Sequence, residues 1–507
     1  MSIESARSKL VEKIEEVATD STNLEQLAYA GASLAKLNEM NVDIGVDSDI
    51  YSIGTAGTVG FGVAAIKDEK IPSGYEKAID HDSLASDNYA KLYDTHGSTF
   101  YNIPPFYYKM TGNVVSIQDT AGAGYVKPRA FMDSPDGFLW AGFMMGNEAG
   151  KLVSKQYLDP VSTNSAHNGI ANLISNPSNN YAGFIDACSS AGFKAPTIFE
   201  WQVIQLIALA QSQSGASSVL CAYNDIAPFF PKGNLANSLK DNSDTSVTFT
   251  ASGYSNCALT GSGVPFAKTT HNGQACGIAD VNGNMWKIVI GLTYLAKTGA
   301  TCDSGSRNVS MSSHGLAVGD TIYFGGTPSS GSTYNTSAYT IETVTDGNSF
   351  TVNADLSRAI VATDGVYSSR YFRILKKTVD ANDLTSANIL DADLYDLLDL
   401  TDNVTSNSGW AYLGNGGNDV FNFSTDTNSK EFNLASAGIP TADGTNGDAD
   451  NTFGKGAVYK YLRHGLVPLV GVTWSYSSPV GVLAMLLLFY SSHSYDSVGG
   501  FASVSLK

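Results

Sequence analysis

The side chains best suited to contact a ligand gather near the C-terminus of the chain. From Leu466 to Leu506 there is no Lys, Arg, Glu, Gln or Asn, and Asp496 carries the one charge. Tyrosine, serine and leucine are frequent there, as they are in antibody loops, which predicts a surface for non-covalent binding. The expected contact residues are Val472, Thr473, Ser475, Tyr476, Ser477, Leu486, Leu488, Phe489, Tyr490, His493, Tyr495 and Asp496.

Residues that could support catalysis do not form a known pattern. The chain has 5 cysteines, widely spaced and without a CxxC pair, so neither a disulfide framework nor a zinc site is expected. None of the 7 histidines has HExxH spacing, and there is no GxSxG motif. We therefore expect no enzymatic activity, no catalytic residue, no metal and no cofactor, and we interpret His493 as a contact residue or a bystander, not as a catalytic base.

Composition limits the class of protein further. At 507 residues the chain is long enough for two to four domains, and 43% hydrophobic residues indicate folded material. The net charge of −18 argues against a nucleic-acid partner, since binding phosphates requires clustered Lys and Arg. Only 15% of residues are charged, and Gly and Tyr are abundant, which is typical of loop-rich β proteins on cell or virion surfaces.

No segment predicts secretion or membrane insertion. The N-terminal residues MSIESARSKLVEKIEEV are charged and have no apolar core like that of a signal peptide. The longest apolar run, Val480–Tyr490, is too short to span a bilayer. A surface-type composition without either signal suggests a component of a virus particle.

The chain changes character along its length. Residues 3–40 predict two short helices, which either pack on their own domain or form a seam between identical subunits. The second alternative predicts a homo-oligomer, such as a trimer. Thr197 and Glu200 form a capping-box pattern that opens a helix. Residues 300–366 alternate in period two between Asp–Gly turns and predict a small β module that folds on its own. Asp380–Asp402 predicts a short helix.

Five sequence blocks share a resemblance to one family. They are YNIPPFYYK (101–109), PTIFEWQVIQLIAL (196–209), CGIADVNGNMWKIVIGL (276–292), RYFRI (370–374) and RHG…GVTW…SPVGVLAML…GGF (463–501). Together they resemble the C-type-lectin-like domain that formylglycine-generating-enzyme relatives share with phage receptor-binding proteins. The resemblance implies an α+β fold with a turn at Gly283–Asn284 and a core aromatic at Trp286; Trp201 and Trp474 are expected to be buried as well.

The same resemblance implies an order of domains. An N-terminal helical and Gly-rich region (1–97) would attach the protein or join subunits. The lectin-like domain would comprise residues 98–299 and 367–507, and the Ig-like β module (300–366) would be inserted between its two parts. The enzymes of this family hold copper through a cysteine pair near the end of the domain, and no cysteine follows Cys302 here. An oxidase of that type is therefore the weaker alternative.

The C-terminal end also resembles the variable region of proteins diversified by retroelements, such as the tropism determinant of a phage tail. In those proteins randomised adenines turn Asn codons into Tyr, Ser, His, Leu, Phe, Asp or Val, but never into Lys, Glu, Gln, Met or Trp. The residues after Leu466 fit this rule if Trp474 and Met485 belong to a fixed frame. The chain departs from the family pattern at Ala502, because the family often shows Gly-Phe-Arg near the end and this chain has Gly500–Phe501–Ala502.

These patterns lead to one functional hypothesis and its alternatives. We expect a receptor-binding protein of a virion tail or tail fibre, which contacts tail components and an unknown protein ligand on the host cell surface. A structural tail protein without variable binding is the alternative. The strand expected near Leu486 and Leu488 either exposes these leucines as a binding strip or buries both of its faces.

Overall fold

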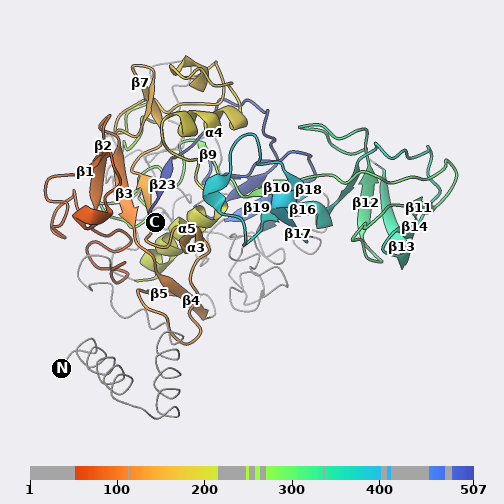
Figure 1. Cartoon of the computed structure of the whole chain (residues 1–507), viewed down its shortest axis with the longest axis horizontal. Coiled ribbons are helices and arrows are strands. Elements are labelled where there is room, and N and C mark those ends of the chain that lie inside the picture. The colour runs from red at the N-terminus through yellow and green to blue at the C-terminus, as the bar shows by residue number, and fades with distance from the viewer. Residues whose placement is uncertain are drawn as a thin grey trace, which may run out of the picture.

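The computed structural model describes residues 52–111, 114–214, 247–249, 257–262, 270–335, 337–400, 408–412, 456–473 and 482–507. Strands dominate this part of the chain (Figure 1). Its α-helices are α3 (Ala130–Asp133), α4 (Tyr181–Ser190) and α5 (Ile198–Gln213), while the strands β1 to β23 form six sheets. The described fold is therefore mostly β, and the predicted α+β, C-type-lectin-like class is wrong.

The N-terminal region contributes strands to the body of the protein. The helices predicted within residues 3–40 lie outside the described residues. Residues 52–97 contain only a short 3-10 turn, η1 (Asp68–Lys70), and the strands β1 (Tyr75–Lys77) and β2 (Lys91–Asp94). These two strands belong to a sheet of order β1-β2-β3-β6-β23, which crosses the domain boundary expected at residue 98.

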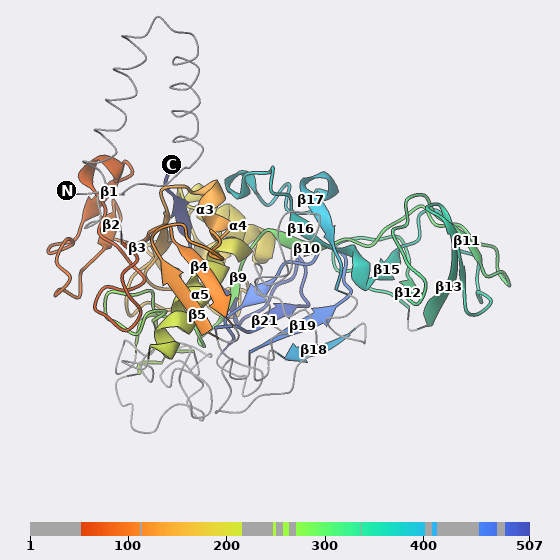
Figure 2. The same cartoon turned by 90° about the horizontal axis from the view of Figure 1, so that it is seen from below.

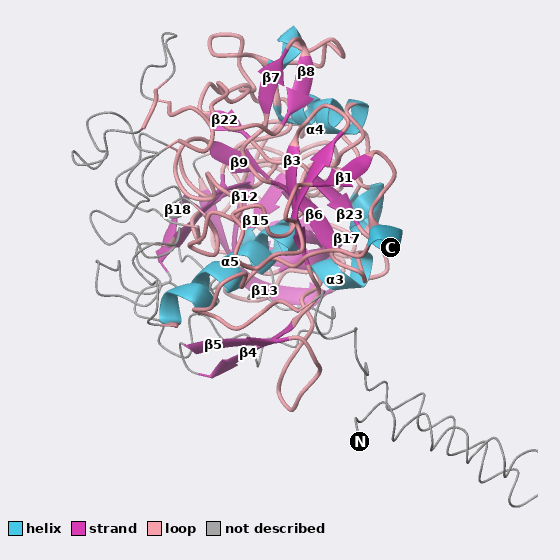
Figure 3. Cartoon of the chain, turned by 90° about the vertical axis from the view of Figure 1, so that its left-hand side faces the viewer, coloured by secondary structure: helices cyan, strands magenta, loops and turns pink. Residues whose placement is uncertain are grey.

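The first large sheet contains strands from the beginning and from the end of the described chain. Beside β1 and β2 it contains β3 (Thr99–Ile103), β6 (Phe138–Ala141) and β23 (Ser503–Ser505), all in antiparallel pairs. Two hairpins flank it: β4 (Tyr107–Thr111) with β5 (Val114–Gln118), and β7 (Gly146–Glu148) with β8 (Lys151–Val153). In Figure 3, helix α5 lies between β6 and the β4–β5 hairpin.

Helix α5 is buried on every side and organises the core. Its capping box is present as predicted, since Glu200 N donates to Thr197 Oγ1 at 3.1 Å and Thr197 N donates to Glu200 Oε2 at 2.8 Å. Trp201 packs against Trp140 of β6 at 6.2 Å between ring centroids, and its indole donates to Val482 O at 3.2 Å. Trp201 and Trp286 are buried, as predicted, and Trp474 lies outside the described residues.

A second sheet carries the C-terminal segment. Its order is β18 (Ser408–Tyr412), β19 (Ala457–Tyr461), β21 (Met485–Leu487), β20 (Leu469–Val470), β9 (Trp286–Ile288) and β22 (Val498–Gly499). The turn before β9 has the predicted backbone, because Gly283 and Asn284 adopt φ values of 77° and 62°. A Cβ at Gly471, just after β20, would come within 2.6 Å of Val281 O, so this frame position requires glycine.

A third sheet replaces the helix predicted at Asp380–Asp402. Its strands are β10 (Leu292–Tyr294), β16 (Phe372–Leu375) and β17 (Tyr395–Leu398). The rest of that acidic segment holds two 3-10 turns, η5 (Ala381–Asp383) and η6 (Ala392–Leu394). Asp380 and Asp391 cap these turns through their own side chains, a local hydrogen bond that competes with helix formation.

Residues 308–368 form a sheet of their own with the order β11-β14-β13-β12-β15. The strands are β11 (Asn308–Ser310), β12 (Thr321–Phe324), β13 (Ala338–Asp346), β14 (Ser349–Val352) and β15 (Val366–Ser368). In Figure 2 this module extends away from the part of the body that contains β10, β16 and β19. Arg370, in η4 (Ser369–Tyr371), joins module and body by pairing with both Asp320 and Asp399.

Candidate binding surface

The structure divides the predicted contact residues into buried and accessible groups. Val472 and Thr473 are buried, and Thr473 Oγ1 donates to Asn284 O at 3.2 Å. Leu486 is 2% exposed: it lies on β21, an interior strand that pairs with β19 and β20, and the strand is covered on both faces because its three residues are all buried in the core. These three residues cannot contact a partner, so the predicted exposed strip is wrong at Leu486.

The accessible group follows directly after β21. Leu488 is half-buried and packs against the core, and Asp496 is also half-buried. Phe489, Tyr490 and His493 keep part of their surface exposed, and Tyr495 is 44% exposed. Ser475, Tyr476 and Ser477 lie outside the described residues.

Three of these rings form a stack. The ring centroids of Phe489 and His493 are 4.5 Å apart with an interplanar angle of 13°, and Tyr495 lies 5.5 Å from Phe489 at 27°. The buried ring of Tyr181 supports the stack with its edge, at 6.2 Å from Phe489 and 6.0 Å from His493. The stack therefore packs against a buried core residue, which holds the rings in place.

The backbone of this loop is fixed by helix α4. The first N–H groups of a helix have no partner inside it, and here the loop supplies two: Tyr181 N donates to His493 O at 3.2 Å and Ala182 N donates to Ser491 O at 2.9 Å. Thr163 holds the next residues, since its Oγ1 donates to Tyr495 O at 2.9 Å and accepts from Tyr495 N at 3.1 Å. Such anchoring presents aromatic side chains with little conformational entropy left to lose.

A cationic side chain lies between two further tyrosines. The Arg463 guanidinium is 5.0 Å from the ring centroid of Tyr461, at the end of β19, and 5.5 Å from that of Tyr490. Tyr490 is in turn 5.1 Å from His493. We define the aromatic face as Tyr461, Arg463, Phe489, Tyr490, His493 and Tyr495.

A loop of the β module borders the aromatic face. Gly331 N donates to His464 O at 2.9 Å, and His464 N donates to Ser332 O at 3.0 Å, so the loop at 329–334 pairs with the backbone beside Arg463. Side chains extend this contact: Ser330 Oγ lies 3.2 Å from Ser491 Oγ, and Thr333 Oγ1 lies 3.2 Å from Tyr461 OH. The module therefore takes part in building the surface that presents Tyr461, Arg463 and Tyr490.

Sequence reasoning did not assign Tyr461, Arg463 or the module loop to the contact surface. Arg463 stands in the RHG block that was assigned to the frame, and no local pattern distinguishes a ring-stacked arginine from a structural one. The loop is more than a hundred residues away in sequence, so only the folded structure brings it to this place. The alternation of Tyr459 and Tyr461 along β19 was a usable signal for an aromatic side chain there.

Arg463 is the charged residue of the aromatic face, and it acts on the histidine beside it. Burial lowers the pKa of His493, and the nearby Arg463 lowers it further. Burial and Arg373 lower the pKa of His464 in the same way. Both imidazoles therefore favour the neutral form near neutral pH, and the guanidinium supplies the positive charge at the surface.

The described residues contain no group of three or more His, Cys, Asp or Glu side chains placed to hold a metal ion. The cysteines in this part of the chain, Cys188, Cys257, Cys276 and Cys302, are buried, and burial raises the pKa of each thiol. A buried thiol with a raised pKa is a poor nucleophile. No helix among the described residues is long and apolar enough to cross a membrane.

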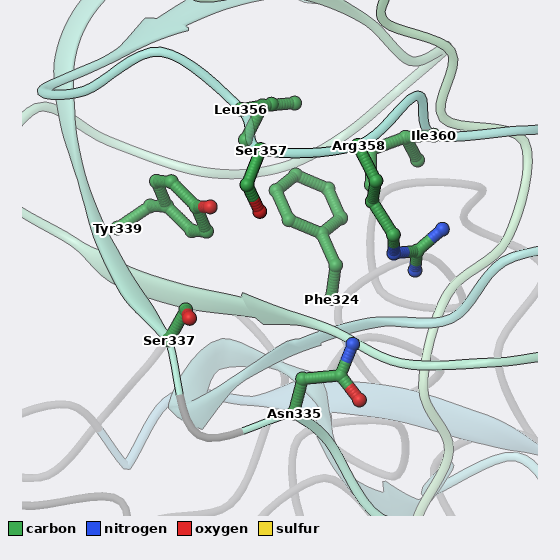
Figure 4. Close-up of a pocket in the computed structure, with 8 residues that line it drawn as sticks. All are labelled: Phe324, Asn335, Ser337, Tyr339, Leu356, Ser357, Arg358 and Ile360. Atoms are coloured by element: carbon green, nitrogen blue, oxygen red, sulfur yellow. The ribbon is translucent and has the colours of Figure 1, made fainter. Parts of the chain in front are cut away.

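One small pocket lies inside the β module (Figure 4). Its volume is about 60 Å³, which leaves room for only a few water molecules. Arg358, which lines it, already donates to Asp364 Oδ2 at 2.6 Å and to Gly325 O at 3.0 Å. The other lining residues are Phe324, Asn335, Ser337, Tyr339, Leu356, Ser357 and Ile360. We assign no ligand to this pocket.

Comparisons with known proteins give no family. No family profile matches the chain, and no curated protein matches it. Among solved structures it has a local similarity to the tailspike protein gp49 from Pseudomonas phage LKA1, at 23% sequence identity and a TM-score of 0.13. The matched part covers 16% of this chain and 15% of the tailspike, so the chain spans a small fraction of that protein.

Proposed function

We propose that this protein is a receptor-binding protein of a phage tail and that it binds a protein on the host cell surface through the aromatic face. The observation that carries the proposal is the group of partly exposed rings around Arg463, each held by the core, by α4 or by the module loop. Tyr, Trp and Arg dominate the energetics of protein interfaces because they provide large contact areas and directional hydrogen bonds. Rigid support raises affinity further, since less freedom is lost on binding.

The proposed activity is binding without catalysis. The aromatic face contains one imidazole, His493, and neither a carboxylate nor a hydroxyl nucleophile is hydrogen-bonded to its ring within the described residues. General acid–base chemistry needs such a partner to orient the imidazole. The stacking of His493 on Phe489 suits a contact surface better.

A finer part of the proposal concerns sequence variation. We propose that the exposed residues of the C-terminal segment differ between related copies through a diversity-generating retroelement, whereas the buried frame stays constant. Within this proposal we assign Val472, Thr473 and Leu486 to the constant frame, because they are buried. The DNA beside the gene tests this proposal, which predicts a near-copy of the 3′ coding end that differs mainly at adenines, next to a reverse transcriptase gene.

Flow cytometry tests the proposed activity. Fluorescently labelled full-length protein is mixed with a panel of bacterial strains, with and without protease treatment of the cells. We expect staining of particular strains, loss of staining after protease treatment, and loss of staining when Tyr490 is replaced by Asn. Staining that survives protease would contradict a protein ligand. A protein that stains no strain, but is located in the tail of a virion by antibody, would instead be a structural tail component.

A further inference from the structure

Two arginines in the described part of the chain differ from the other arginines there because they form no ion pair. Four arginines form an ion pair with an aspartate: Arg129, Arg307, Arg358 and Arg370. Arg373 and Arg463 form no ion pair with any residue that the structure describes, although the whole chain has a net charge of −18. An excess of carboxylates makes an unpaired arginine on a partly exposed surface unusual, and Arg463 lies on the aromatic face.

The side chain of Arg463 is held in place without being neutralised. Its guanidinium lies between the rings of Tyr461 and Tyr490, at 5.0 Å and 5.5 Å from their centroids. Cation–π contacts of this kind fix the plane of the guanidinium but leave its hydrogen-bond donors unused. Gly331 lies against the far ring, since a Cβ there would come within 2.7 Å of Tyr490 Cζ, and this contact limits movement of the ring.

Several nitrogen atoms around this guanidinium are buried without a hydrogen-bond partner in the described structure. They are Arg373 Nε, Arg463 Nε, His464 Nδ1 and His493 Nε2. Buried polar atoms are nearly always paired. A neutral imidazole nitrogen can donate or accept, but the two arginine nitrogens can only donate, so their lack of a partner indicates a missing acceptor. Burial lowers the pKa values of His464 and His493, and the charges of Arg373 and Arg463 lower them further. The charge of Asp393 acts on Arg373, but Asp393 forms no ion pair with it in the described structure, and no described carboxylate pairs with Arg463.

We infer that Arg463 is the point at which the aromatic face receives a carboxylate side chain, Asp or Glu, from the protein partner. The planar guanidinium matches a carboxylate through two parallel hydrogen bonds, and the rings of Tyr461 and Tyr490 shield that pair from water. The surrounding Tyr, His and Ser side chains have the composition of antibody contact surfaces, which favours a protein as the source of the carboxylate. This inference rests on the proposed function and adds the chemistry of the contact.

A random peptide library displayed on yeast tests the inference without knowledge of the natural partner. The full-length protein is the bait, in parallel with three variants. Arg463→Gln removes the charge but keeps a polar side chain, Tyr490→Asn removes a ring of the aromatic face, and Arg307→Gln removes a paired arginine on the module away from this face. Thermal melts of all four proteins establish that each is folded.

We expect peptides selected by the wild type to be enriched in Asp or Glu at one position. Arg463→Gln should weaken their binding about tenfold or more, Arg307→Gln should leave it unchanged, and rising salt should weaken it for the wild type. Peptides that bind through Tyr490 but contain no acidic residue would overturn the carboxylate inference and leave the proposed function standing. If no selected peptide depends on Tyr490 or Arg463, both the inference and the proposed binding face are wrong.

Discussion

Gly331 of the β module lies directly against the ring of Tyr490, a residue 159 positions later in the chain: a Cβ at Gly331 would come within 2.7 Å of Tyr490 Cζ. The backbone of Gly331 has a φ of +88°, a conformation that side chains with a Cβ rarely adopt. Both facts make glycine necessary at this position. The contact also ties the orientation of Tyr490, and with it the Arg463 guanidinium, to a loop of the module.

The first prediction follows from that contact. Gly331→Ala should displace the Tyr490 ring, lower binding to a stained strain about tenfold or more, and cost about 1–3 kcal/mol in free energy of unfolding. Gly326→Ala is the matched control, because a Cβ there meets nothing within 4 Å and the backbone is not left-handed. Flow cytometry and chemical denaturation measure the two effects. Equal binding by both variants would show that the loop does not position Tyr490.

The second prediction concerns Leu486, which sequence analysis placed on an exposed strip. Leu486→Asn should lower the free energy of unfolding by about 3 kcal/mol or more, because it introduces an unpaired amide into a buried strand. Leu84 is 52% exposed, and Leu84→Asn should change stability by about 0.5 kcal/mol or less. Urea denaturation compares the two variants. A Leu486→Asn protein as stable as the wild type would restore the exposed-strip hypothesis.

The third prediction is a dependence of stability on pH that arises from His271. Burial lowers the pKa of His271 from its ordinary 6.5 to about 4. Its Nδ1 accepts from Ile278 N at 3.2 Å, and its Nε2 lies 3.2 Å from Gly62 O, so a doubly protonated ring would lose an acceptor that the fold needs. The unfolded chain binds this proton first, so the contribution is complete above pH 6.5 and is lost as pH falls toward 4.

The size of this contribution is about 3 kcal/mol, since each unit of pKa difference corresponds to about 1.4 kcal/mol. Urea denaturation of the wild type and of His271→Gln at pH 7.5, 6 and 5 measures it. The wild type should lose more stability than the variant between pH 7.5 and pH 5. Parallel pH profiles would show that His271 is not a buried neutral imidazole.

The fourth prediction concerns the β module. Lys297 and Val366 face each other as an antiparallel bridge, so a two-residue Asn–Gly turn can replace residues 298–365. Because the strands of the three body sheets lie outside that range, the shortened protein should still fold, as circular dichroism and a cooperative melt would show. The shortened protein lacks the loop at 329–334, so it should no longer bind a strain that the full-length protein stains. An insoluble product would contradict independent folding of the body.

Local rules predicted part of this fold well. The capping box at Thr197, the turn at Gly283–Asn284 and the buried Trp201 depend on interactions that are close in sequence or on one hydrophobic residue type. The helix expected at Asp380–Asp402 failed because spaced aspartates favour capped turns over a continuous helix. The fold class failed because pairing among short strands is a tertiary property that single segments do not reveal.

The candidate site was predicted only in part for the same reason. Phe489, Tyr490, His493 and Tyr495 are accessible as expected, since a tyrosine-rich loop after an apolar strand favours exposure. Leu486 is buried because both faces of β21 pack in the core, and the alternation of side chains along the strand could not show that the second face is covered. Arg463 and Gly331 gain their roles from contacts between distant segments.

One measurement tests the central claim most directly: cell staining by wild type, Tyr490→Asn and Tyr157→Asn proteins of confirmed thermal stability. Tyr157 is the matched control, a tyrosine that is 56% exposed and lies outside the aromatic face. If the aromatic face binds the receptor, Tyr490→Asn should require about thirtyfold more protein for half-maximal staining, and Tyr157→Asn should match the wild type. Undiminished staining by a folded Tyr490→Asn protein would contradict the account.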